Sequence, residues 1–156
     1  MFRYADDLCI CCNDLNDAKR IEKALEKRLE RFKLQLNKEK THSVIFNRRM
    51  GCRGSGTFDF LGFTFYMGRS LKGRSLPKLK SSGKRFRSKL KRVSEWAKMI
   101  RNRLPLKEIW RRFCAKLRGH VQYYGVSFNI KNVERFLWRS TSIMFKWLNR
   151  RSQKKS

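Results

Sequence analysis

Two adjacent acidic side chains, Asp6 and Asp7, lie between short apolar runs in the stretch FRYADDLCICC. These runs predict strands at residues 2–4 and 8–12, joined by a tight turn at residues 5–7. Carboxylate oxygens are the ligands that Mg²⁺ prefers. Two such ions about 4 Å apart activate the attacking oxygen and stabilise the leaving oxygen in phosphoryl transfer. The pair is therefore either a binding site for divalent metal ions or two ordinary turn residues, because Asp is also common in turns.

The sequence that follows predicts the elements that must hold this turn. Asp14 and Asn16 are candidate N-caps for a helix of about four turns, whose apolar stripe should pack on the sheet. Strands are expected up to residue 36 and at residues 43–46. A hairpin is expected in TFDFLGFTFYMG, where Gly62 indicates a tight bend or a close backbone approach. This order of strands, helix, strands and hairpin predicts an α+β module.

Positive charge is concentrated in the second part of the chain. The 156 residues carry 40 Lys and Arg against 12 Asp and Glu, a net charge of +28, of which residues 1–68 hold +4 and residues 69–156 hold +24. A chain this basic needs a polyanionic partner, and nucleic acid is the commonest one. Residues 69–83 are rich in Gly, Ser and Lys, and their apolar residues do not recur at a helical or strand spacing. This pattern predicts a linker or loop.

Three helices are expected after this linker, near residues 86–100, 109–124 and 133–148. Pro105 separates the first two, Gly125 suits the end of the second, and their apolar faces should form a small bundle. Trp138 and Phe145 lie on another face of the third helix, where they either pack against the protein or a partner or stack on unpaired RNA bases. The candidate phosphate-binding side chains outside the apolar stripes are Arg85, Arg87, Lys89, Lys91, Arg92, Arg111, Arg112, Lys116 and Arg118.

The cysteines and the hydropathy of the chain indicate the cellular compartment to expect. The five cysteines are unevenly spaced, which favours reduced thiols in a cytoplasmic setting. Cys9 and Cys12 form a CxxC pair with poor geometry for zinc, because they lie on opposite faces of the expected strand. No apolar run approaches the ~20 residues of a membrane span, so no membrane partner is expected. A basic membrane-active protein would also leave the paired acids unexplained.

Four motifs in order carry a resemblance to a known family. The string YADD arises by chance in a chain of this length with a likelihood on the order of 1 in 1,000. It is followed by LQLNKEKT, FDFLGFTF and LRGHVQYYG. With these motifs, nearly the whole chain resembles the reverse transcriptases encoded by group II introns, often called maturases. The resemblance implies a partial palm in residues 1–68, followed by a basic all-α thumb or maturase-specific region in residues 84–156.

The resemblance also implies roles for individual residues. Asp6 would be a catalytic Mg²⁺ ligand and Asp7 would assist it. Lys40 would lie near the phosphates of the incoming nucleotide, although without the resemblance an ordinary turn lysine is the favoured interpretation. The residues implied near the primer terminus are Tyr4, Ala5, Phe60, Leu61, Gly62 and Phe63. The thumb motif comprises Leu117, Gly119, Tyr123 and Tyr124, where Gly119 allows close approach of a helix or of RNA.

The sequence departs from the family pattern at its start. A polymerase palm needs another metal-binding aspartate upstream of YADD, together with fingers. We therefore expect a C-terminal fragment that is inactive alone and needs an upstream polypeptide. The implied partners are structured intron RNA and an RNA template with a DNA primer, in the cytoplasm of a bacterium or in an organelle. Two functions stay open: part of an RNA-directed DNA polymerase, and a non-catalytic RNA-binding module that assists splicing.

Overall fold

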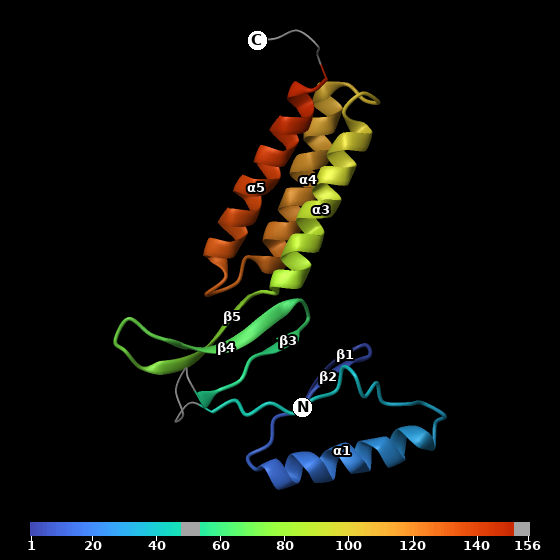
Figure 1. The fold of residues 1–156 in the computed structure, drawn as a ribbon, viewed down its shortest axis with the longest axis vertical. Helices are drawn as coiled ribbons and strands as arrows, with labels where there is room; N and C mark the ends of the chain where they lie inside the picture. The colour runs from blue at the N-terminus through green and yellow to red at the C-terminus, as the bar shows by residue number, and fades with distance from the viewer. Residues whose placement is uncertain (48–53, 152–156) are drawn as a thin grey trace.

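The computed structural model describes residues 1–47 and 54–151. The molecule is elongated, with a helical bundle at one end, a three-stranded sheet in the middle, and a short hairpin with one helix at the other end (Figure 1). Small antiparallel sheets combined with helices make the fold α+β, as the sequence predicts.

The acidic turn lies in a two-stranded hairpin. Strands β1 (Phe2–Tyr4) and β2 (Asp7–Cys9) pair antiparallel, with Tyr4 opposite Asp7. The turn therefore contains only Ala5, with φ of 49°, and Asp6. Asp7 is the first residue of β2, so the turn is shorter than the predicted one at residues 5–7.

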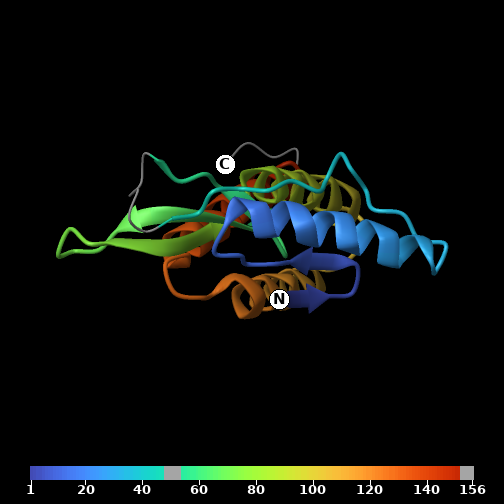
Figure 2. The ribbon, with the colours of Figure 1, turned by 90° about the horizontal axis from the view of Figure 1, so that it is seen from below.

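Helix α1 (Leu15–Glu30) begins where the sequence predicts, because the Asp14 side chain accepts a hydrogen bond from the Asn16 amide at 3.3 Å. None of its residues is buried, and Phe32 just beyond it is 67% exposed. The apolar stripe expected to pack on the sheet is therefore at most half-buried, at Ala18, Leu25 and Leu29. Figure 2 shows α1 lying beside the β1–β2 hairpin at the end of the molecule.

The strands expected up to residue 36 and at residues 43–46 are absent from the described part of the chain. Residues 37–41 form a turn instead, in which the Thr41 amide donates to the Asn37 carbonyl at 2.9 Å. The Ile45 carbonyl accepts a single hydrogen bond from the Gly56 amide at 2.8 Å. A short apolar run becomes a strand only when a neighbouring strand satisfies its backbone, and here none does so along its length.

The central sheet has the order β3 (Phe58–Phe60), β4 (Phe63–Arg69), β5 (Ser75–Ser81), all antiparallel. The predicted hairpin around Gly62 is confirmed as β3–β4. The linker expected at residues 69–83 is wrong, because β5 pairs with β4 from Arg69↔Ser75 to Phe63↔Ser81. In the described sheet β5 is an edge strand, and an edge position tolerates proline and lysine. Pro77 and the lysines of β5 made the segment resemble a loop in the sequence.

The three predicted helices are confirmed as α3 (Gly83–Ile100), α4 (Leu106–Tyr124) and α5 (Ile130–Asn149). The indole of Trp147 on α5 donates a hydrogen bond of 3.0 Å to the Ser94 hydroxyl on α3. None of the helices in the described ranges is long and apolar enough to cross a membrane. The fully buried core of the bundle consists of Ala97, Ile100, Ile109, Phe113 and Met144.

Candidate functional site

The β1–β2 hairpin exposes the two acids that the sequence singles out. Both Asp6 and Asp7 are exposed, and so is Tyr4 at 67%. The Arg3 guanidinium donates a hydrogen bond of 3.1 Å to the Ala5 carbonyl, which braces the turn. The hairpin therefore presents two carboxylates in sequence at its tip, where metal or phosphate-bound metal can reach them.

Lys40 lies in a separate exposed turn. Its amide donates to the Asn37 carbonyl at 3.1 Å and to the Asn37 side chain at 3.2 Å. Among residues 1–47 and 54–151, no hydrogen bond or ion pair joins Lys40 to Asp6 or Asp7. The structure thus does not bring the three predicted catalytic side chains into contact.

The acidic pair by itself does not make up a metal site. Its oxygen donors are of the kind that Mg²⁺ prefers. Within the described ranges, however, no group of three or more His, Cys, Asp or Glu side chains could hold a metal ion. Asp6 and Asp7 would therefore need ligands beyond these protein groups, such as water and phosphate oxygens.

The predicted primer-terminus hairpin packs against the predicted thumb motif. The Tyr123 hydroxyl donates a hydrogen bond of 2.7 Å to the Leu61 carbonyl. The Phe63 ring lies 5.8 Å from the Tyr123 ring and 5.1 Å from the Tyr124 ring, measured between centroids. The structure therefore brings FLGF and the tyrosine pair together, whereas Tyr4 and Ala5 lie in the other hairpin.

Gly62 makes the close backbone approach that its position in the strand pattern predicts. It is buried, and its φ is 83°. A Cβ atom there would lie 2.8 Å from the Tyr124 hydroxyl and 3.3 Å from Cδ of Arg85. Its carbonyl accepts a hydrogen bond of 2.9 Å from the Ser82 amide at the start of α3. The turn is thus held between α3 and α4.

Asp59 and Asn129 complete this junction. The Asp59 carboxylate accepts hydrogen bonds from the hydroxyls of Thr64 and Ser82, which ties the β3–β4 hairpin to the start of α3. Asn129 is fully buried and accepts a hydrogen bond of 2.7 Å from the Ser81 amide while donating to the Tyr124 carbonyl at 2.8 Å. Sequence reasoning missed Asn129, and an Asn before a helix would in any case predict an N-cap.

Lys89 differs from the other cations assigned to phosphate binding. It is half-buried, and its ammonium lies 4.2 Å from the centroid of the Tyr124 ring, a cation–π distance. Burial lowers the pKa of Lys89, and the positive charges of Arg85 and Arg92 lower it further. Lys89 therefore supports the aromatic junction, while the other eight predicted phosphate-binding residues are exposed.

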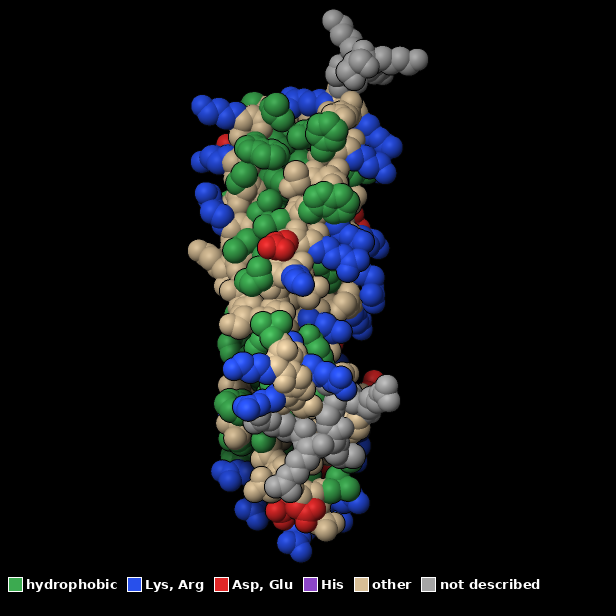
Figure 3. All heavy atoms as spheres, turned by 90° about the vertical axis from the view of Figure 1, so that its left-hand side faces the viewer, with side chains coloured by type: hydrophobic (Ala, Val, Ile, Leu, Met, Phe, Trp, Pro, Cys, Tyr) green, Lys and Arg blue, Asp and Glu red, His purple; other side chains and the backbone are tan. Residues whose placement is uncertain are grey.

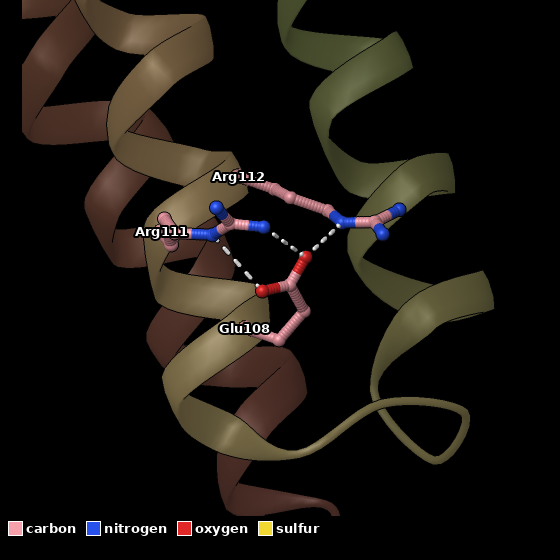
Figure 4. Close-up of polar contacts among 3 residues, drawn as sticks. All are labelled: Glu108, Arg111 and Arg112. Atoms are coloured by element: carbon pink, nitrogen blue, oxygen red, sulfur yellow. Dashed lines mark hydrogen bonds and ion pairs between the residues drawn. The ribbon is translucent and has the colours of Figure 1, made fainter.

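Two of these exposed residues share one acidic partner (Figure 4). Arg111 donates to both carboxylate oxygens of Glu108, at 3.0 and 2.9 Å, and Arg112 donates to one of them at 2.7 Å. These hydrogen bonds lower the pKa of Glu108 to about 2. Glu108 therefore stays ionised at neutral pH and offsets part of the positive charge of α4.

His120 is buried beneath the tyrosine pair. Its ring stacks on Phe136, with centroids 3.7 Å apart, and on Tyr124 at 4.6 Å. Neither ring nitrogen has a hydrogen-bond partner in the described part of the chain. Burial, and secondarily the charge of Lys89, lowers the pKa of His120 to about 4. The imidazole is therefore a neutral packing group at physiological pH.

The other thumb-motif residues divide between core and surface. Leu117 packs against the bundle core. A Cβ atom at Gly119 would meet no described atom within 4 Å, so of the two expected neighbours of Gly119, a helix of this chain is not found there. Trp138 and Phe145 are 70% and 66% exposed, so most of each side chain faces solvent. Figure 3 shows the side of the molecule that lies on the left in Figure 1. On that side, hydrophobic side chains run along the helical bundle, and Lys and Arg side chains lie at the margins.

Comparison with known proteins finds one similarity, in the first part of the chain. Residues 1–65 match the family model for reverse transcriptase (RNA-dependent DNA polymerase). The matched segment contains the β1–β2 hairpin, α1, β3 and the start of β4, and its sequence is similar to that of reverse transcriptases. Comparisons with curated proteins and with solved structures gave no significant match.

Proposed function

We propose that this chain is part of a group II intron RNA-directed DNA polymerase, or maturase, and binds intron RNA and a primer–template. The observation that carries the proposal is the YADD hairpin, exposed at Asp6 and Asp7 inside the segment that matches reverse transcriptase. The contact between the Leu61–Gly62 turn and Tyr123 supports it, since it couples the presumed primer-terminus hairpin to the helical bundle.

In this proposal Asp6 and Asp7 supply oxygen ligands to Mg²⁺, together with water, phosphate and groups from the rest of the palm. The bound ion would supply charge stabilisation for phosphoryl transfer. Lys40 would pair with nucleotide phosphates as a compact cation. Polymerisation would then need the palm strands and fingers that complete such an enzyme.

A primer-extension assay tests the catalytic part. We expect no extension by the purified chain with primed template, Mg²⁺ and deoxynucleotides. Extension should appear when the remaining palm and fingers are supplied as a fusion or a second polypeptide. Asp6→Ala should abolish it, and Lys40→Ala should slow it while leaving primer binding intact.

Asp17→Ala serves as the matched control, because Asp17 is an exposed acid in the first turn of α1. It should leave extension unchanged. Strong extension by the isolated chain would contradict the need for a partner. Full activity of the Asp6→Ala enzyme would remove the metal-ligand role and leave Asp6 as an ordinary turn residue.

RNA binding is the second part of the proposal. Residues 69–156 carry a net charge of +24, and exposed Arg and Lys side chains cover α3 and α4. If about six phosphates are contacted, log K should fall with log salt at a slope near −4 to −5. A slope near zero in a salt titration would rule out this electrostatic mode of binding.

A second candidate function is RNA binding that assists splicing without polymerisation. It is favoured by the incomplete metal site at Asp6 and Asp7 and by the separate core of the bundle. Arg87→Glu combined with Arg118→Glu should weaken RNA binding and splicing more than Asp6→Asn does. If Asp6→Asn leaves splicing intact while no completed enzyme extends a primer, the splicing module is the function.

A further inference from the structure

The tip of the β4–β5 hairpin lies at the side of the molecule, away from the acidic turn (Figure 1). Its residues and Phe128 line a pocket. The pocket is open and has a volume of about 550 Å³. That volume is in the range of small-molecule sites. The residues that define its character are Arg69, Lys72, Arg74, Lys78, Leu76 and Phe128.

The pocket combines cations with apolar surface. Four of its eight lining residues are Lys or Arg, and none is acidic. In Figure 3, where the hairpin tip faces the viewer, Lys and Arg side chains lie on both sides of it. The Lys78 ammonium donates to the Arg69 carbonyl at 2.6 Å and lies 5.4 Å from the centre of the Phe128 ring. Lys72 and Arg74 make no ion pair among the described residues, so they are available to an anion.

The loop that carries these two cations is held by its own hydrogen bonds. The Ser70 amide donates to the Arg74 carbonyl at 2.8 Å, and the Arg74 amide donates to the Ser70 hydroxyl at 3.0 Å. The Gly73 amide closes the turn on the Ser70 carbonyl at 3.0 Å. Little loop ordering would therefore be needed when an anion binds.

Phe128 reaches the pocket from the connection between α4 and α5. Its φ is 68°, a backbone conformation that bulky residues rarely adopt, and its side chain is 55% exposed. The neighbouring Asn129, fully buried and bonded to Ser81 and Tyr124, holds the backbone in place. An exposed aromatic ring kept in a strained conformation beside cations points to a role in binding.

We infer that this pocket binds an unpaired nucleotide of single-stranded RNA. The base stacks on the Phe128 ring over Leu76, and the adjoining phosphate pairs with Lys72 and Arg74. Stacking on aromatic rings combined with phosphate-binding cations is how single strands are held without sequence preference. An acidic peptide would use the cations and leave the aromatic ring without a partner.

This inference rests on the proposed RNA binding and adds a site on elements separate from the cations of α3 and α4. Its test is the affinity for a fluorescent single-stranded oligouridylate at fixed salt. Phe128→Asn removes the ring and suits the left-handed backbone, so affinity should fall about tenfold, as expected for one stacked base. Phe128→Tyr keeps the ring and should bind as the parent chain does.

Phe32→Asn is the matched control, since Phe32 is an exposed phenylalanine, 67% against 55% for Phe128, outside the pocket. It should change affinity less than twofold. Lys72→Gln with Arg74→Gln should make the slope of log K against log salt shallower by about 1.4, because two contacts to single-strand phosphates are lost. Lys27→Gln with Arg31→Gln on the exposed side of α1 removes the same charge and should alter the slope less.

The outcomes separate the two proposals. If the parent chain binds RNA with a steep salt dependence but Phe128→Asn and Phe32→Asn have equal effects, the pocket assignment is overturned and the proposed RNA binding stands. If polyglutamate displaces the oligouridylate from the parent and Phe128→Asn chains equally well, the stacking role is overturned. If the parent chain shows no salt-dependent RNA binding, both proposals fail.

Discussion

The hydroxyl of Tyr123 donates a hydrogen bond of 2.7 Å to the carbonyl oxygen of Leu61, 62 positions earlier in the chain. This bond joins the turn of the β3–β4 hairpin to the end of α4. Around it, Phe63 packs on both tyrosines, and Gly62 leaves room for Tyr124. The sheet and the bundle are therefore coupled at the two motifs that the family resemblance implies at the primer terminus and in the thumb.

Tyr123→Phe removes this hydrogen bond and keeps the ring contact with Phe63. Because the tyrosine is partly exposed, we expect the free energy of unfolding to fall by about 0.5–1 kcal/mol. Tyr4→Phe is the control, since Tyr4 is 67% exposed and its hydroxyl has no partner among the described residues. Urea unfolding of both variants measures the difference, and equal stabilities would show that the bond contributes nothing.

Gly62→Ala and Gly73→Ala separate backbone strain from steric conflict. Both glycines have positive φ, 83° and 75°, so each alanine should cost roughly 1–2 kcal/mol. Only at Gly62 would the new methyl group meet a neighbour, the Tyr124 hydroxyl at 2.8 Å. Gly62→Ala should therefore cost about 1–3 kcal/mol more than Gly73→Ala in thermal or urea unfolding. Equal costs would mean that Tyr124 moves aside freely.

His120 makes stability depend on pH. Above pH 6.5 the imidazole is neutral in both the folded and the unfolded chain. Below that value the unfolded chain binds a proton that the folded chain, with a His120 pKa of about 4, does not bind. The free energy of unfolding should therefore fall between pH 6.5 and 4, by up to about 3 kcal/mol from this group.

His120→Leu removes the titrating group and leaves no buried nitrogen without a partner. Urea unfolding at pH 7, 6, 5 and 4 should show a smaller loss of stability for this variant than for the parent chain. His42→Leu, at an exposed position, is the control and should keep the pH dependence of the parent. Parallel curves for all three chains would place the pH dependence elsewhere.

Glu108→Gln releases Arg111 and Arg112 from their shared carboxylate. If α4 binds RNA phosphates, affinity should rise and the salt slope should steepen by up to about 1.8 for duplex contacts. Stability should change little, because solvent screens ion pairs at the surface. Glu95→Gln is the control, because Glu95 has only a long 3.9 Å contact with Lys91. The same affinity change in both variants would indicate a general charge effect.

Local periodicity and short motifs determined much of what the sequence predicts. The helices of the bundle and the β3–β4 hairpin lie where apolar spacing and Gly62 place them, because those signals act over a few residues. The YADD turn was readable for the same reason. Strand β5 could not be predicted, because a segment with Pro77 and lysines is typical of a loop. Its strand structure depends on pairing with β4.

Only the tertiary structure decided which distant residues meet. The bond from Tyr123 to Leu61, the buried Asn129 network and the pocket that Phe128 shares with the β4–β5 loop join segments about 50 to 60 residues apart. The incomplete burial of the α1 stripe and the open surface at Gly119 also depend on the packing of the whole chain. A sequence pattern specifies which face of an element can be buried, and whether another element covers that face depends on the packing of the whole chain.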